Sequence, residues 1–275
     1  MKAEAVGTPE SHLVTHRSEG VMGTVVTIDV YSEQTTGSPE ISIGLARARA
    51  TLRQADAVFS TWKTDSPMSR LRRGEISCAE APPQVGDVLD LCATARELSG
   101  GWFDPWAMPG GIDPTGYVKG WAAQRALDAL RSGGVSGAMV NAAGDVASFG
   151  GPQSATAFRI GIVDPFAPRQ LACVVELTGA IATSGSYERG EHLIDPWTRR
   201  PTTRAASASV TGPDLGLADA LATALVIAGK AGLTSIEAID GYQGFVISFD
   251  GTWQWTDGFA FASSDACRYT PGNAA

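Results

Sequence analysis

The order of helix-like and strand-like segments is the feature that most constrains the fold of this 275-residue chain. In the first half, apolar residues recur at helical spacing over residues 39–55, 85–98 and 118–131, and strand-like stretches occupy 21–31 and 138–141. In the second half, one strong helix pattern at 217–228 interrupts short strand-like stretches at 159–163, 171–177, 206–211, 245–249 and 252–255. Helices and strands do not alternate regularly. This order favours an α+β fold with mixed or antiparallel sheets over a doubly wound parallel sheet.

Composition supports a well-packed domain, because 44% of the residues are hydrophobic and 18% are charged. The chain also has 32 glycines and 15 prolines, which indicates many turns or close approaches of the backbone to a ligand. We expect one domain over residues 19–263, between flexible tails at 1–18 and 264–275.

The charge balance narrows the class of partner. With 29 acidic and 21 basic residues the net charge is −8, so neither nucleic acid nor an anionic membrane is expected to bind, and a phosphate must be held locally. We find no apolar run of the ~18 to 20 residues that span a bilayer, and no signal-like run in the first twenty residues, so we expect a cytoplasmic protein. The four cysteines form no C-x-x-C pair, which favours buried free thiols over a zinc site.

Residues 113–122 are a first candidate binding segment. A turn with Gly116 precedes a helix pattern, and Lys119 falls in the first turn of that helix. Free amides at a helix start, beside a cation, suit an anionic phosphate. A capped helix with a solvated lysine explains the same residues.

Residues 141–145 follow a predicted strand. Their small residues would let a ligand lie on the backbone, and Asn141 and Asp145 offer polar groups. A hairpin turn explains this segment equally well.

A third segment holds His192, the only histidine beyond the first twenty residues. Ser184, His192 and Asp195 could suggest a hydrolase triad, but the chain has no G-x-S-x-G elbow. A histidine flanked by Leu193 and Ile194 is more often structural than catalytic.

The helix at 217–228 carries Asp219 and Thr223, whose i, i+4 spacing places both oxygens on one face. Alanine and leucine border this face, where an unpaired carboxylate would be costly to bury. A hard cation such as Mg²⁺, completed by substrate phosphates, would satisfy both oxygens. The alternative is that Asp219 caps the start of the helix.

Seven short segments between about residues 20 and 230 occur in the order typical of one family. They are Met22-Gly23-Thr24, Phe59-Ser60-Thr61-Trp62 with Asp65-Ser66, Asp113-Pro114-Thr115-Gly116 with Lys119-Gly120, 141–145, 182–187, 192–196, and Ala218-Asp219 with Thr223. Together they resemble the ApbE family, the flavin transferases that move FMN from FAD onto a threonine or serine of an acceptor protein. The resemblance implies an α+β architecture related to the T-fold, with an FAD cleft between two halves.

The resemblance also implies roles for single residues. Asp219, Thr223 and the backbone carbonyl of Gly116 would bind Mg²⁺ at the FAD pyrophosphate, and Lys119 would add positive charge there. Met22 and Trp62 would contact the flavin ring. His192 would act as general base for the acceptor hydroxyl. The remaining matched contacts to the dinucleotide would come from Asp113, Asn141, Gly144, Asp145, Ser184 and Gly185.

The activity that the resemblance implies is Mg²⁺-dependent transfer of FMN from FAD to an acceptor flavoprotein, with release of AMP. An FAD pyrophosphatase and a non-catalytic FAD-binding protein are the alternatives. The chain departs from the family pattern in Trp62, where tyrosine is common, and in Ala143-Gly144, where a glycine pair is usual. Many members are exported lipoproteins, whereas here we expect an intracellular acceptor.

Overall fold

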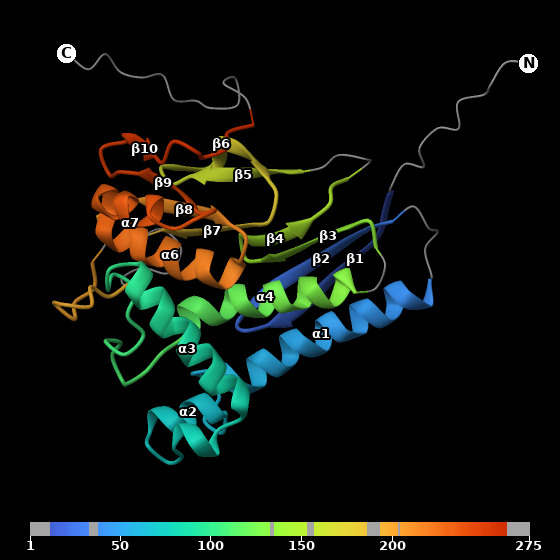
Figure 1. Ribbon diagram of the computed structural model, residues 1–275, viewed down its shortest axis with the longest axis horizontal. Helices are drawn as coiled ribbons and strands as arrows, with labels where there is room; N and C mark the ends of the chain where they lie inside the picture. The colour runs from blue at the N-terminus through green and yellow to red at the C-terminus, as the bar shows by residue number, and fades with distance from the viewer. Residues whose placement is uncertain are drawn as a thin grey trace, which may run out of the picture.

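A computed structural model describes residues 12–32, 38–132, 135–152, 157–185, 193–202 and 204–262. Its centre is an eight-stranded sheet in the order β1-β2-β3-β4-β7-β8-β9-β10, in which every paired neighbour is antiparallel (Figure 1). The strands of this sheet are β1 His12–Val21, β2 Thr24–Ser32, β3 Gly137–Ala142, β4 Asp145–Phe149, β7 Ala180–Gly185, β8 Ser207–Gly212, β9 Gln243–Ile247 and β10 Trp253–Trp255. The two remaining strands, β5 Phe158–Asp164 and β6 Ala167–Leu177, form a separate hairpin.

The helices all lie on one side of the large sheet, and the second and third of them lie farthest from it (Figure 1). They are α1 Pro39–Phe59, α2 Pro67–Arg72, α3 Pro83–Leu98, α4 Thr115–Arg131, α6 Leu215–Ala228 and α7 Leu233–Glu237, with short 3₁₀ turns at Cys78–Glu80 and Gly229–Gly232. Helix α4 lies between α1 and α6, and all three contribute to one core that runs from Val21 to Val246. On the other face, the β5–β6 hairpin packs on Val146, Ile181 and Phe245 and forms a smaller core.

Local sequence explains the long helices. In α1, the Ser38 side chain accepts a hydrogen bond from the Ile41 amide at 3.3 Å, and Pro39 occupies the first helical position. Ala48, Leu52 and Ala55 then repeat at helical spacing and are buried. Helix α6 is different, because twelve of its fourteen residues are buried. It packs on strands β7 and β8 of the sheet and against α4 beside it.

The segment Leu215–Glu237 is long and apolar enough to cross a membrane by length and composition. However, 78% of its most apolar window is buried inside the protein. The same properties are found in the central helix of a soluble domain, so this segment is weak evidence for a membrane span.

The predicted α+β class is confirmed, and so are the helices expected around 39–55, 85–98, 118–131 and 217–228. Three expectations need correction. Strand β1 begins at His12, so residues 12–18 are paired with β2 and are not a tail. The strand expected at 21–31 is interrupted by a turn at Met22-Gly23, and α4 begins at Thr115, which places Gly116 inside the helix. Strands β4 and β7 and helices α2 and α7 were not predicted.

The cysteines follow the expectation in part. Cys92 and Cys173 are buried free thiols, whereas Cys78 is exposed. Burial raises the pKa of the Cys92 thiol to about 12, which keeps it protonated and unreactive. Cys267 and the tail expected at 264–275 lie outside the described residues.

The N-cap of α6 generates a prediction about pH. The Asp214 side chain accepts a hydrogen bond from the Leu217 amide at 2.8 Å, and burial raises the pKa of this carboxyl above its usual 3.8. The ionised form is therefore less favourable in the folded chain than in the unfolded chain, and this cost appears as pH rises through the raised pKa.

We expect Asp214→Asn to keep the cap and to remove that cost, so its free energy of unfolding relative to the parent should improve between pH 3 and pH 7. Asp214→Ala loses the cap and should be destabilised by ~1 kcal/mol at acid pH, where the parent carboxyl is neutral. Urea unfolding at several pH values measures both. A constant difference between Asp214→Asn and the parent at every pH would contradict the assignment.

Candidate functional site

A cavity of about 770 Å³, here the main cavity, opens where segments from both halves of the chain meet. Its walls are the β1–β2 turn, the C-terminal end of α1, the loop before α4, the first turns of α4, the β3–β4 turn, the end of β7 and one face of α6. Its size is within the usual range for small-molecule and cofactor sites.

A buried charged cluster lies at one wall of the main cavity. The Lys119 ammonium forms an ion pair with Asp145, and its Nζ is 3.4 Å from Asp219 Oδ2. Asp145 and Asp219 are only 1% and 4% exposed. The Thr183 amide donates to Asp145 Oδ1 at 3.0 Å, and the Gly120 amide donates to Asp219 Oδ2 at 3.2 Å. With both carboxylates ionised, two negative charges and one positive charge leave this cluster at −1, so it can accept further positive charge.

Thr223 lies one helical turn beyond Asp219, as predicted from the spacing. Its Oγ1 is 3.3 Å from Ser184 Oγ, and both residues line the main cavity. Gly116 is next to them, because a Cβ built on it would lie 3.8 Å from Thr223 Oγ1. Asp219 is the fifth residue of α6 and the N-cap is Asp214, so the alternative that Asp219 caps the helix is wrong.

These donors can be compared with the needs of a metal. The carboxylate of Asp219 and the hydroxyl of Thr223 are hard oxygen ligands, and their surroundings carry excess negative charge, so they fit Mg²⁺. Within the described part of the chain no three His, Cys, Asp or Glu side chains gather into a metal cluster. A metal here would therefore need oxygens from backbone, water or substrate to complete its shell.

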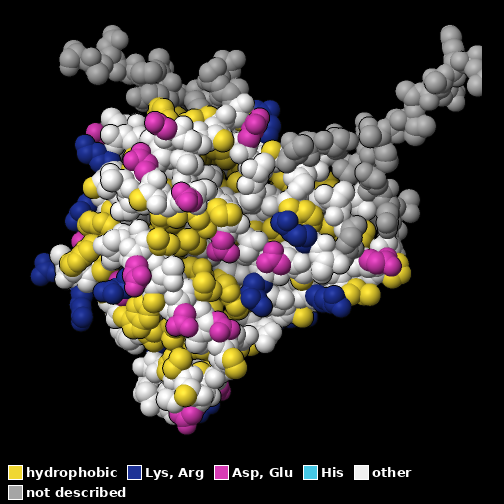
Figure 2. All heavy atoms as spheres, viewed as in Figure 1, with side chains coloured by type: hydrophobic (Ala, Val, Ile, Leu, Met, Phe, Trp, Pro, Cys, Tyr) yellow, Lys and Arg dark blue, Asp and Glu magenta, His cyan; other side chains and the backbone are white. Residues whose placement is uncertain are grey.

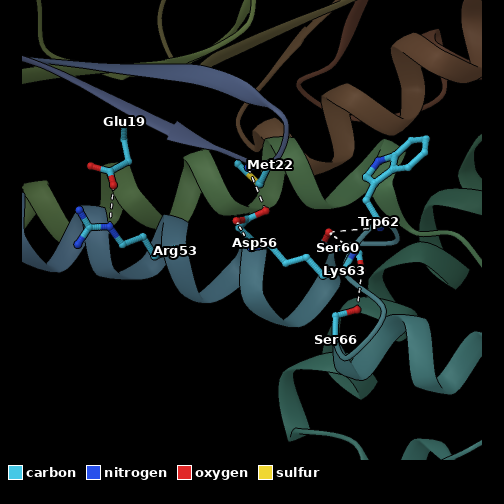
Figure 3. Close-up of polar contacts among 8 residues, drawn as sticks. All are labelled: Glu19, Met22, Arg53, Asp56, Ser60, Trp62, Lys63 and Ser66. Atoms are coloured by element: carbon cyan, nitrogen blue, oxygen red, sulfur yellow. Dashed lines mark hydrogen bonds and ion pairs between the residues drawn. The ribbon is translucent and has the colours of Figure 1, made fainter.

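Met22 and Trp62 lie on a wall held together by Asp56 of α1 (Figure 3). Asp56 Oδ1 accepts a hydrogen bond from the Met22 amide at 3.1 Å, and its Oδ2 is 2.5 Å from Lys63 Nζ. Met22 has a positive φ of 53°, and so does Gly23 at 70°, as a two-residue type I′ turn requires. One carboxylate thus fixes two segments that are far apart in the sequence.

Trp62 is the most exposed large apolar side chain of the described residues, at 91%. Its turn is nonetheless fixed, since Ser60 Oγ accepts hydrogen bonds from the Trp62 and Lys63 amides at 3.3 and 3.2 Å. The Ser66 hydroxyl donates to the Ser60 carbonyl. Figure 3 shows the indole standing away from α1. It offers an aromatic face that no other described side chain covers.

Asp113 belongs to the lining but has internal partners. Its Oδ2 is 2.7 Å from Arg72 Nη1, and its Oδ1 accepts from the Thr115 amide at 3.0 Å. Arg72 also donates to the Pro109 carbonyl at 3.1 Å. Asp113 therefore anchors the loop before α4 and the start of that helix.

Some predicted residues shape the site from outside its lining. Asn141 Oδ1 accepts from the Gly144 amide at 2.8 Å, so both residues build the β3–β4 turn, in which Ala143 reaches the main cavity. The hairpin interpretation of this segment is confirmed, with Ala143 and Gly144 at φ of 55° and 99°. Gly185 pairs with Ser207 in the sheet. His192 lies outside the described residues, while Leu193 and Ile194 line the main cavity.

Asp56 and Lys63 were not predicted from the sequence. An acidic residue beside Ala55 and close to Phe59, both buried on the apolar side of α1, was the available signal for Asp56. No structural role was predicted for Asp195, although its carboxylate accepts hydrogen bonds from the Trp197 and Thr198 amides at 2.9 and 3.0 Å.

Comparison with known proteins adds family information. The model of the ApbE family matches residues 22–110 and 109–246. Two relatives called FAD:protein FMN transferase match part of the chain. The one from Rhodobacter capsulatus is 35% identical over 151 residues, which are 51% of this chain and 29% of the relative. The one from Vibrio cholerae is 32% identical over 130 residues, which are 43% of this chain and 39% of the relative. The chain thus spans well under half the length of these relatives.

Solved structures agree on the fold. The flavin transferase ApbE from Vibrio cholerae superposes with a TM-score of 0.77 and 22% identity, over 90% of this chain and 97% of that chain. The ApbE protein from Thermotoga maritima gives a TM-score of 0.76 and 21% identity, over 88% and 97%.

The crossing of α4 and α6 generates a stability prediction. A Cβ on Gly120 would lie 2.3 Å from the Leu215 carbonyl oxygen and 3.0 Å from Asp219 Cβ. We expect Gly120→Ala to push the helices apart and to lower the free energy of unfolding by at least about 2 kcal/mol. Gly86→Ala on α3, where a Cβ would meet only Cys78 Sγ at 4.0 Å, is the matched control and should add up to ~1 kcal/mol. Equal effects in urea unfolding would contradict the close-contact explanation.

The link through Asp56 generates a prediction about local order. Asp56→Ala removes the acceptor of the Met22 amide, and a hydrogen bond to a charged group contributes about 1.5–3 kcal/mol. We expect amide hydrogen exchange at residues 22–24 to become at least about tenfold faster, and Asp56→Asn, which keeps an acceptor oxygen, to change it less.

Glu19→Gln is the control on the same hairpin. Glu19 pairs with Arg49 and Arg53 of α1 at 2.7 and 2.6 Å, farther along β1 from the turn (Figure 3 shows Arg53). Its loss should affect exchange in the strand and leave residues 22–24 protected. Unchanged exchange at these residues in Asp56→Ala would disprove the role of Asp56.

Proposed function

Because the chain belongs to the ApbE family, we propose that it transfers FMN from FAD to a threonine or serine hydroxyl of an acceptor flavoprotein, in the presence of Mg²⁺ and with release of AMP. One observation carries this proposal most directly. A buried cluster of Asp145, Lys119 and Asp219, with Thr223 beside it, lies at the wall of a cavity of about 770 Å³. The relatives called FAD:protein FMN transferase support the same activity.

FAD would occupy the main cavity with its pyrophosphate at the charged cluster and its flavin toward Met22 and Trp62. The exposed indole of Trp62 supplies the flat apolar face that an isoalloxazine ring stacks on. The open turn of Met22 and Gly23 lets the backbone approach the ring closely. The flavin ring and the pyrophosphate of the substrate would thus meet two different kinds of surface.

Asp219 and Thr223, with the carbonyl of Gly116, would hold Mg²⁺. When bound, the ion supplies positive charge that stabilises the charge developing on the phosphates. Lys119 supplies a second positive charge at the same place, and its ion pair with the deeply buried Asp145 fixes the position of its ammonium group. Gly120 orients Asp219 through its amide.

In the proposed reaction the acceptor oxygen attacks the FMN phosphorus, an O–P bond forms, and the bond from that phosphorus to the bridging oxygen breaks. AMP leaves with the bridging oxygen, and the hydroxyl proton goes to a general base. His192 remains the prediction for that base, on the strength of the family resemblance. Leu193 and Ile194, which follow it in the chain, line the main cavity.

One assay separates this activity from its two alternatives. The protein is incubated with FAD, Mg²⁺ and a purified domain that bears an acceptor threonine, and covalent flavin fluorescence and free AMP are measured. We expect labelled acceptor and AMP in equal amounts. AMP without labelled acceptor would identify an FAD pyrophosphatase, and neither product would identify a non-catalytic binding protein.

The metal assignment generates a prediction of its own. Asp219→Ala removes the one carboxylate that lies on the same face as Thr223, so transfer should fall by at least about a hundredfold, and Mg²⁺ should no longer raise the melting temperature in the presence of FAD. Asp240→Ala, which removes an exposed carboxylate, is the control and should retain both properties. Full transfer by Asp219→Ala would rule out the Mg²⁺ site at this residue.

A further inference from the structure

A second hollow of about 550 Å³, here the side groove, adjoins the main cavity. It is formed by the end of α3, the loop around Asp104 and Trp106, and the segment around Trp197. Asp104 lines both spaces. Trp102 lines the main cavity and Trp197 lines the side groove, and their rings meet edge to face with centroids 4.3 Å apart. The walls of the two spaces therefore meet at Asp104 and at this aromatic pair.

The segment that carries Trp197 is rigidly built. Asp195 accepts hydrogen bonds from the Trp197 and Thr198 amides, and the Arg199 amide donates to the Asp195 carbonyl at 2.8 Å. Gly101 lies against the indole, because a Cβ at this position would be in van der Waals contact with Trp197 Cζ2 at 3.4 Å. The side groove therefore has fixed walls on the Trp197 side.

Backbone strain supports a function for this groove. Among the described residues, the non-glycine residues with positive φ are Met22, Ala143 and Arg199. Met22 and Ala143 line the main cavity, and Arg199, at φ 55°, lines the side groove. Strain of this kind is concentrated at binding and catalytic sites.

We propose that the side groove is the docking site for the acceptor protein, and that it holds an extended, nearly uncharged segment next to the hydroxyl-bearing residue. This inference rests on the proposed function, in which FAD fills the main cavity and a macromolecule must deliver a hydroxyl to it. The side groove is the adjoining space, and it shares Asp104 with the wall of the main cavity.

The residues that line the side groove indicate what kind of acceptor segment it would bind. Its four charged side chains are Arg96, Glu97, Asp104 and Arg199, which sum to zero, and Arg96 is already paired with Asp104 at 2.7 Å. Trp106 and Trp197 are 43% and 59% exposed and offer apolar faces. Figure 2 likewise shows hydrophobic, acidic and basic side chains intermixed over the region of α3 and its neighbouring loops. Such a surface suits an apolar side chain on a neutral backbone stretch better than a strongly charged peptide.

The test uses two changes that act in different ways. Trp106→Ala removes an exposed aromatic face, and Ala107→Trp fills the side groove without removing a native contact. We expect both to lower kcat/KM for the acceptor domain at least about tenfold, mainly through KM, while the Kd for FAD stays within about twofold. Trp255→Ala, 41% exposed on β10, and Ala238→Trp, at the end of α7, are the matched controls and should behave as the parent.

The outcomes are distinct from those that test the proposed function. If the parent transfers FMN and both groove variants keep the kcat/KM of the parent for the acceptor, the docking site is wrong and the activity stands. A matching loss of FAD affinity in both variants would also overturn it, because the groove would then serve the main cavity. If the parent labels no acceptor, the proposed function and the docking site both fail.

Discussion

The close contact between α4 and α6 at Gly120 is the constraint on which the rest of the site depends. At this point the backbone of α4 approaches α6 so nearly that a single methyl group would collide with the Leu215 carbonyl. The contact lets the Gly120 amide reach Asp219 and places the Lys119 ammonium beside the same carboxylate. It also sets Gly116 next to Thr223. A larger residue at position 120 would move the proposed metal ligands apart although it replaces none of them.

Two turns of the sheet form part of the wall of the main cavity. The β1–β2 and β3–β4 hairpins both use two-residue turns with positive φ at both central residues, and both turns reach the main cavity. Met22 and Ala143 are not glycine, so each turn carries a steric cost that the surrounding structure must offset. For Met22 the compensation is visible, since Asp56 accepts its amide hydrogen. The cavity wall is therefore held by contacts between the sheet and the helical layer.

The sequence predicted the parts of this architecture that are encoded locally. Helices α1 and α6 follow from apolar periodicity, and the shared face of Asp219 and Thr223 follows from their i, i+4 spacing. Strand β7 was missed because Ala180–Gly185 consists mainly of small residues with no alternating pattern, and β1 was missed because it is polar. The pairing of Lys119 with Asp145 and Asp219 joins α4, the sheet and α6, so no local pattern contains it. Met22 and Trp62 were found through family resemblance, whereas Asp56, which links their segments, carries no motif.

A transferase and a hydrolase differ in the nucleophile that reaches the phosphorus, which is a protein hydroxyl in the first and water in the second. A cavity of about 770 Å³ that is open to solvent admits water, so the charged cluster alone gives no preference for a protein hydroxyl. Preference requires that the acceptor oxygen be held in place, because a well-oriented bound group reacts at an effective concentration that far exceeds that of free water. The side groove is placed to hold the acceptor, and the main cavity contains the charged cluster. On the proposed function, the side groove would therefore bind the acceptor and the main cavity would stabilise the phosphates, and their walls meet where Trp102 contacts Trp197.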